Sequence, residues 1–187
     1  KIAVVTGGSR GLGRNMALHL ARAGTDVVFT YRSARAEADA VQADIQALGR
    51  KAVALPLDVG RTGGFPAFVD ALKAALAQTW QRERIDFLIN NAGMGVYAPF
   101  SEVTEAQFDE LVNVHFKGVF FLTQRLLPLI HDGGRIVNIS SGLARVALPN
   151  YSAYAAMKGA IEVLTRYQAK ELGARGITVS TVAPGAI

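Results

Sequence analysis

The sequence predicts an α/β fold built on a parallel, doubly wound sheet, and three observations support this. Short, nearly continuous apolar runs alternate along the chain with longer amphipathic segments. Most of the runs are rich in Val and Ile, which is typical of strands that are covered on both faces. No linker, internal repeat or low-complexity tract interrupts the alternation. We therefore expect one domain over residues 1–187.

The apolar runs are the expected strands of this sheet. They are Ile2–Thr6, Val27–Tyr31, Ala52–Leu57, Ile85–Asn90, Arg135–Ser140 and Ile177–Val182. The amphipathic segments between them are the expected helices. They are Leu12–Ala23, Ala34–Leu48, Phe65–Trp80, Glu105–Ile130 and Tyr151–Leu172. Thr104 and Gln107 have the spacing of a capping box, which predicts that the fourth helix begins there.

The composition excludes several kinds of site. Hydrophobic residues make up 50% of the chain and charged residues 19%, which indicates a globular protein. The chain has no Cys, so it has no disulfide, thiol nucleophile or Cys-ligated metal. His19, His115 and His131 are not at metal-ligand spacing, so we expect no metal site. No apolar run is long enough to cross a bilayer, and we expect a cytoplasmic protein without a membrane partner.

The charge balance is basic, with 20 Lys and Arg against 15 Asp and Glu. Such a balance can indicate nucleic-acid binding. Here the basic residues are scattered and form no long block or patch with interleaved aromatic residues. We therefore expect no nucleic-acid partner. A basic enzyme that binds a phosphorylated cofactor would carry the same charge.

A glycine-rich turn follows the first expected strand and opens the first expected helix. Residues 6–13 read TGGSRGLG. Glycines allow a tight turn and the close approach of a pyrophosphate, which a helix N-terminus binds through its free N–H groups. The alternative is a strand–helix turn that binds no ligand. We expect a dinucleotide-binding loop made of Gly7, Ser9, Arg10, Gly11, Leu12 and Gly13.

The end of the second expected strand favours NADP(H) over NAD(H). An Asp or Glu at this place binds the ribose hydroxyls of NAD, whereas a basic residue suits a 2′-phosphate. The sequence there is Tyr31, Arg32 and Ser33, with no carboxylate. Arg32 can bind a phosphate with two hydrogen bonds, and Arg10 can add a second cation. The alternative for Arg32 is a solvated loop charge.

Tyr154 and Lys158 form a candidate acid/base pair. Their spacing of four residues on an expected helix places both side chains on one face. A free Tyr has a pKa of about 10, and a nearby ammonium group favours the phenolate and lowers that pKa. The alternative is a packed helical Tyr beside a surface Lys.

Taken together, these motifs resemble the short-chain dehydrogenase/reductase family, and in particular its 3-oxoacyl reductase-like members. The resemblance covers the whole chain. The matching residues are the loop Thr6–Gly13, Asp58 and Val59 after the third strand, Asn90–Gly93 after the fourth, the tetrad Asn113, Ser141, Tyr154 and Lys158, and Pro184 and Gly185 after the sixth.

The resemblance implies a role for each member of the tetrad. Tyr154 would protonate the carbonyl oxygen in reduction, or accept the alcohol proton in oxidation. Ser141, rather than its neighbour Ser140, would polarise that oxygen. Lys158 would lower the pKa of Tyr154 and bind the nicotinamide ribose. Asn113 would position a water in a proton relay to Lys158; from the residues alone, a helical Asn satisfied by local backbone is favoured.

The resemblance also implies the remaining cofactor contacts. These are Asp58, Val59, Asn91, Ala92, Gly93, Pro184 and Gly185, together with Tyr154 and Lys158 themselves. The implied fold is a Rossmann-type domain. Members of the family usually continue past the Pro-Gly motif, so we expect residues 1–187 to lack the C-terminal lid and a seventh strand.

The expected activity is NADP-dependent reduction of a ketone or aldehyde to an alcohol, or the reverse, on a small-molecule substrate. A 3-oxoacyl thioester, a steroid, a sugar and a small ketone all fit the sequence. The alternative function is a non-catalytic, NADP-binding regulatory module. The family usually forms dimers and tetramers, so we expect a homodimer or homotetramer.

Overall fold

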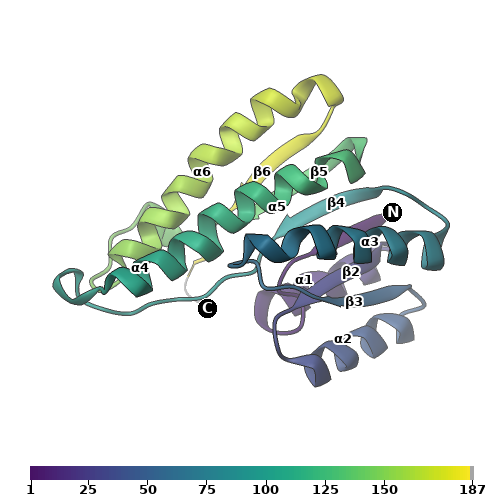
Figure 1. Ribbon diagram of the computed structural model, residues 1–187, viewed down its shortest axis with the longest axis horizontal. Coiled ribbons are helices and arrows are strands. Elements are labelled where there is room, and N and C mark those ends of the chain that lie inside the picture. Colours follow the sequence, from purple (N-terminus) through teal and green to yellow (C-terminus); the bar gives the residue numbers. More distant parts are fainter. Residues whose placement is uncertain (186–187) are drawn as a thin grey trace.

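The computed structural model describes residues 1–185, and its α/β fold confirms the predicted sheet (Figure 1). Its strands are parallel and lie in the order β3-β2-β1-β4-β5-β6. The strands are β1 (Ile2–Val5), β2 (Asp26–Tyr31), β3 (Ala52–Pro56), β4 (Ile85–Asn90), β5 (Ile130–Ile139) and β6 (Thr178–Val182). The order reverses between β1 and β4, and ligands bind at such a point in open α/β sheets.

Helices cover both faces of the sheet, and each face has its own apolar cluster. One cluster joins the sheet to α1 and α2 through residues such as Leu18, Val41 and Ile45. The other joins it to α3 and α5 through residues such as Leu72 and Leu122, with the end of α6 packed against it. The helices are α1 (Gly11–Arg22), α2 (Arg35–Ala47), α3 (Phe65–Trp80), α4 (Glu105–Val112), α5 (Gly118–Leu126) and α6 (Ser152–Leu172). The predicted capping box of Thr104 and Gln107 is confirmed at the start of α4.

The predicted fourth helix over Glu105–Ile130 is helical as far as Leu129, but it is not one regular α-helix. A π-helical turn over Asn113–Lys117 separates α4 from α5, and a 3₁₀ turn over Leu127–Leu129 leads directly into β5. At the end of the π turn, Gly118 packs against the Val59 carbonyl, where a side chain would collide. A π turn adds one residue to a helical turn and shifts the facing of the later residues, and a regular α-helical spacing does not predict where this happens.

The fifth strand begins five residues before its predicted start at Arg135, because Ile130 already pairs with Ile85 of β4. The register then shifts between Ile85 and Phe87. The segment after Ile130 is polar and includes Gly133 in the left-handed region. This first part of the strand therefore shows no apolar pattern that would predict it.

Candidate active site

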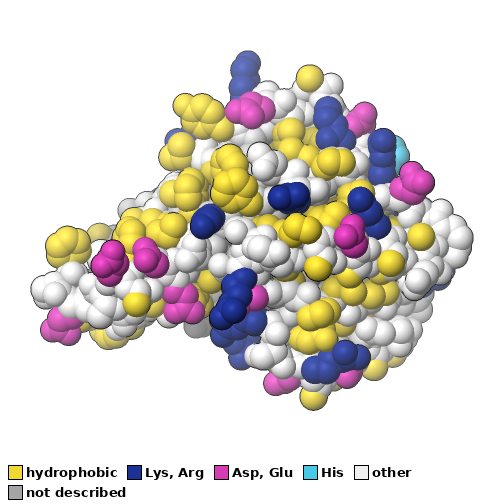
Figure 2. Space-filling view, viewed as in Figure 1, with side chains coloured by type: hydrophobic (Ala, Val, Ile, Leu, Met, Phe, Trp, Pro, Cys, Tyr) yellow, Lys and Arg dark blue, Asp and Glu magenta, His cyan; other side chains and the backbone are white. Residues whose placement is uncertain are grey.

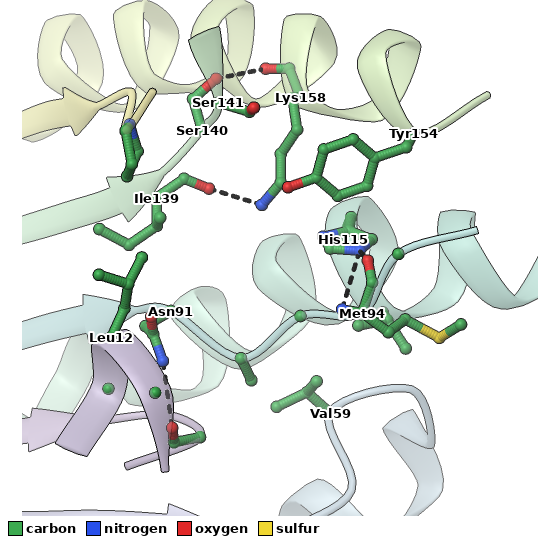
Figure 3. Close-up of a pocket in the computed structure, with 18 of the residues that line it drawn as sticks. Leu12, Val59, Asn91, Met94, His115, Ile139, Ser140, Ser141, Tyr154 and Lys158 are labelled. Carbon is green, nitrogen blue, oxygen red and sulfur yellow. Dashed lines mark hydrogen bonds between the residues drawn. The ribbon is translucent and has the colours of Figure 1, made fainter. Parts of the chain in front are cut away.

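A cleft of about 940 Å³ opens at the carboxyl ends of the strands. This volume lies within the range of small-molecule and cofactor sites. Every residue that the sequence assigned to the cofactor lines this cleft. Ser141, Tyr154 and Lys158 of the tetrad also line it (Figure 3). Asn113 is not among the residues that line it; His115, two positions later, is. The structure therefore brings together three of the four expected catalytic residues.

The glycine loop leaves the start of α1 open toward the cleft. Gly7 has a φ of +66°, and an added Cβ would lie 2.9 Å from the Ala92 backbone, so only glycine fits this turn. Gly13 packs against the Gly7 carbonyl, where a Cβ would collide. The N-cap residue of α1, Arg10, makes no side-chain capping bond, and the first turn carries no acidic residue. Free N–H groups at a helix start fit the pyrophosphate of a dinucleotide.

Asn91 and Thr6 fasten the glycine loop to the end of β4. The Asn91 side-chain amide donates to the Thr6 carbonyl at 2.8 Å and to the Gly7 carbonyl at 3.2 Å. The Thr6 hydroxyl accepts from the backbone N–H groups of Asn91 and Ala92 at 2.9 and 3.0 Å. This double connection fixes the glycine loop against the end of β4.

Two exposed arginines lie at the end of the cleft next to β2. Arg10 and Arg32 both line it, beside the buried Tyr31. The Tyr31 hydroxyl accepts a hydrogen bond from Arg35 at 3.2 Å. Among the described residues that line the cleft, Asp58 is the one carboxylate, and it accepts from the Gly60 N–H at 2.9 Å. This end of the cleft fits an anionic group better than a bare hydroxyl.

Lys158 is buried and held by the end of β5. Its ammonium donates to the Ile139 carbonyl at 2.8 Å and lies 5.5 Å from the centre of the Tyr154 ring. In Figure 3 the phenol oxygen of Tyr154 points toward this ammonium. Burial lowers the pKa of Lys158 from 10.5 to about 8, so the group is still mostly charged at neutral pH.

The two serines after β5 have different partners. The Ser140 hydroxyl donates to the Lys158 carbonyl and lies near the Glu162 carboxylate. The Ser141 oxygen accepts from the Leu143 N–H at 3.2 Å, so its hydroxyl can still act as a donor on the cleft side, where Tyr154 lies. Ser140 thus joins β5 to α6, and Ser141 lines the cleft.

The net pKa of Tyr154 is raised in this structure, not lowered as expected. Burial of the half-buried phenol raises its pKa above 10.0, and the neighbouring Ser141 offsets only part of that rise. Burial disfavours the phenolate more than the surroundings stabilise it. Tyr154 is therefore protonated at neutral pH, which is the form that donates a proton.

His115 is the functional candidate that the sequence did not indicate. It is buried under Tyr154, and the two ring centres are 5.2 Å apart with planes at 89°. A single His in an apolar helix is usually a packed core residue, so nothing in the sequence around His115 indicated a functional role. The π turn before α5 brings it to the cleft.

The burial of the Lys158 charge should cost stability. We expect Lys158→Met to unfold at a higher urea concentration than the parent at pH 7, with a gain of about 1–2 kcal/mol and a loss of activity. The lowering of the Lys158 pKa corresponds to a cost of about 3 kcal/mol for burying its charge. The Met variant avoids this cost but loses the hydrogen bond to Ile139, which contributes about 1 kcal/mol.

The pH dependence provides the check on this stability prediction. Between pH 8 and 10.5 the unfolded chain binds more protons at Lys158 than the folded chain, so the parent gains stability with rising pH. The advantage of Lys158→Met should therefore shrink over this range. A variant that is less stable than the parent at pH 7 would contradict the prediction.

Within residues 1–185, no helix has the length and apolar character needed to cross a bilayer. Over the same residues, no three His, Asp or Glu side chains lie close enough to bind a metal ion. On the face in Figure 2, basic side chains are scattered among acidic ones. That distribution offers no continuous basic surface on this face.

Comparison with known proteins gives the same assignment along the whole chain. The family model described as short chain dehydrogenase matches residues 1–187. The hydroxynaphthalene reductase-like protein Arp2 of Metarhizium brunneum is 37% identical over 188 residues, which cover 100% of this chain and 68% of that protein.

Two solved structures superpose closely on the chain. The landomycin C-6 ketoreductase LanV with bound NADP and rabelomycin has a TM-score of 0.96 and 39% identity, over 100% of this chain and 76% of its own. The promiscuous reductase LugOII, which catalyses keto-reduction at C1 in lugdunomycin biosynthesis, has a TM-score of 0.96 and 42% identity, over 99% of this chain and 73% of its own.

Proposed function

Because the chain belongs to the short-chain dehydrogenase family and is an NAD(P)-dependent oxidoreductase, we propose that it reduces a ketone to an alcohol with NADPH. The observation that carries the proposal is the meeting of Ser141, Tyr154 and Lys158 in one cleft with the open start of α1. When bound, NADPH supplies the hydride. The residues of the chain bind the substrate oxygen and deliver a proton to it.

Tyr154 is the proposed proton donor. Its phenol faces the cleft, and burial keeps it protonated at neutral pH. As the carbonyl carbon is reduced, negative charge develops on the substrate oxygen, and the Tyr154 proton moves to that oxygen. Lys158, a buried cation beside the ring, stabilises the phenolate that remains. In the reverse reaction Tyr154 accepts the alcohol proton.

Ser141 is the proposed second contact to the same oxygen. Because its oxygen already accepts from the Leu143 N–H, its hydroxyl hydrogen is the part left to interact with a substrate. A fixed donor of this kind stabilises the developing oxyanion without reorganising during the reaction. Ser141 and Tyr154 together would fix where the carbonyl binds.

NADPH is the proposed cofactor rather than NADH. The support is the pair of exposed cations, Arg10 and Arg32, at the β2 end of the cleft, where no carboxylate occupies the end of the strand. A 2′-phosphate gains charge-assisted hydrogen bonds from such residues. The similar ketoreductase LanV was solved with NADP.

A fused-ring aromatic ketone is the proposed substrate class. The cleft wall near Tyr154 contains the apolar side chains of Met94, Val146 and Leu148 and the ring of Tyr151. A flat aromatic ring system buries its faces well against such a wall. The names of the similar proteins refer to hydroxynaphthalene and to an angucycline.

The proposed function is tested by following NADPH consumption with three ketones. They are 2-tetralone, a small aliphatic ketone and a 3-oxoacyl thioester. We expect kcat/KM for 2-tetralone to exceed that for the aliphatic ketone by about tenfold or more, because the second ring buries several additional carbons. NADPH binding without turnover of any ketone would favour the alternative, a non-catalytic NADP-binding regulatory module.

We also propose that copies of the chain associate through α4, α5 and α6. Large apolar side chains are exposed on these helices, and Figure 2 shows apolar side chains over α5 and α6. They are Phe108, Phe120, Phe121, Val163 and Tyr167. Exposed apolar patches of this kind are typical of interfaces, which supports the expected homodimer or homotetramer.

A further inference from the structure

The π turn between α4 and α5 determines which residue faces the catalytic helix. Val114 and His115 are buried at 7% and 2% exposure, whereas Asn113 is half-buried at the start of the turn. π turns inside helices often occur at functional sites. In this chain the turn places His115, and not Asn113, among the residues that line the cleft.

The backbone of Met94 anchors the His115 ring. The Nε2 atom lies 2.6 Å from the Met94 carbonyl oxygen and 3.2 Å from the Met94 nitrogen. The shorter distance assigns the proton to Nε2, which donates to the carbonyl. Figure 3 shows the ring against this backbone segment. Met94 follows Ala92 and Gly93, which line the cofactor region of the cleft, so the anchor joins that segment to the helix.

The other nitrogen of the ring, Nδ1, is buried and has no hydrogen-bond partner within residues 1–185. A buried polar atom without a partner is costly and is rare in folded proteins. The groups that face His115 are Tyr154 and Lys158 from α6 and the Gly93–Met94 backbone. Burial and the Lys158 charge lower the pKa of His115 to about 4, so the ring is neutral while Lys158 carries the charge.

We propose that His115 is a positioning residue for the catalytic pair, in the place that the sequence assigned to Asn113. Its edge-to-face contact holds the Tyr154 ring, and its bond to Met94 fixes that ring relative to the cofactor segment. A neutral ring does this without placing a second cation beside Lys158. The inference rests on the proposed reductase function, because it concerns the proton donor of that reaction.

Three variants test the proposal with NADPH and 2-tetralone. His115→Ala removes the ring and the anchor, and we expect kcat to fall by about tenfold to a hundredfold, since small displacements of a reacting group have effects of this size. The KM for NADPH should change by less than about threefold, because the remaining cofactor contacts are intact. His115→Gln can still bond to Met94 and stays neutral, so it should recover part of the lost kcat. His19→Gln, an exposed His on α1, is the matched control.

A second readout does not depend on turnover. Carbon-13-labelled tyrosine reports each phenol by NMR, and Tyr154→Phe assigns the Tyr154 signal. We expect His115→Ala to shift that signal while the signals of Tyr31 and Tyr167 stay in place.

The outcomes separate this inference from the proposed function. If the parent reduces none of the ketones, the proposed function fails, whatever the NMR result. If the parent is active but His115→Ala keeps its kcat and its Tyr154 signal, the positioning role is overturned. A larger loss of kcat in Asn113→Ala than in His115→Ala would overturn the proposal and favour the predicted water relay through Asn113.

Discussion

Tyr154→Phe is expected to lower kcat by about 10²–10⁴-fold, the usual contribution of a positioned general acid. The change removes one hydroxyl from a half-buried ring whose phenol oxygen points into the cleft. The ring contacts with His115 and Lys158 remain, so the fold and the affinity for NADPH should be nearly unchanged. Steady-state kinetics with 2-tetralone and a binding titration with NADPH measure the two effects separately.

Tyr167→Phe is the matched control for this prediction. It removes the same hydroxyl from the same helix, but at an exposed position that is not among the described residues lining the cleft. Its kcat should equal that of the parent. If Tyr154→Phe retained kcat within about threefold of the parent, another group would have to supply the proton, and Tyr154 would not be the acid.

The sequence predicted the sheet because the signal for a parallel sheet is strong and local. Buried strands are apolar on both faces, so runs such as Ile85–Asn90 stand out from the amphipathic helices around them. The glycine loop was equally clear, because its glycines meet steric demands that few other residues can satisfy. The ends of the strands were harder to predict. Polar residues and glycines follow Ile130 in the first part of β5, so no apolar pattern marks where this strand begins.

The site was predicted less completely, for a geometric reason. Tyr154 and Lys158 lie on a regular helix, where a spacing of four residues fixes a common face. Asn113 and His115 lie in a π turn, where that rule fails, because one additional residue rotates every later side chain around the axis. The pKa of Tyr154 could not be predicted either, because it depends on how deeply the phenol is buried relative to the nearby charge.

Cofactor choice should show a preference for NADPH over NADH of about tenfold or more in kcat/KM. Each charge-assisted bond from Arg10 or Arg32 to a 2′-phosphate contributes about 1.5–3 kcal/mol, which is roughly a tenfold to hundredfold effect. Both side chains are exposed, so added salt should reduce the preference by screening. Tyr31→Asp combined with Arg32→Ala should reverse it, because a carboxylate repels the phosphate and accepts from the ribose hydroxyls.

Two further variants separate the charge of Arg32 from the packing of Tyr31. Tyr31 is buried and accepts from Arg35, so the double variant also removes a packed ring, whereas Arg32→Ala alone removes only the exposed cation. Arg32→Ala should lower kcat/KM for NADPH and leave that for NADH unchanged. Arg84→Ala removes an exposed Arg just before β4, at the opposite end of the sheet, and should alter neither value.

A parent enzyme that prefers NADH would overturn the assignment. An equal loss with both cofactors in the double variant would show that Arg32 points to solvent and that the Tyr31 ring serves both cofactors alike.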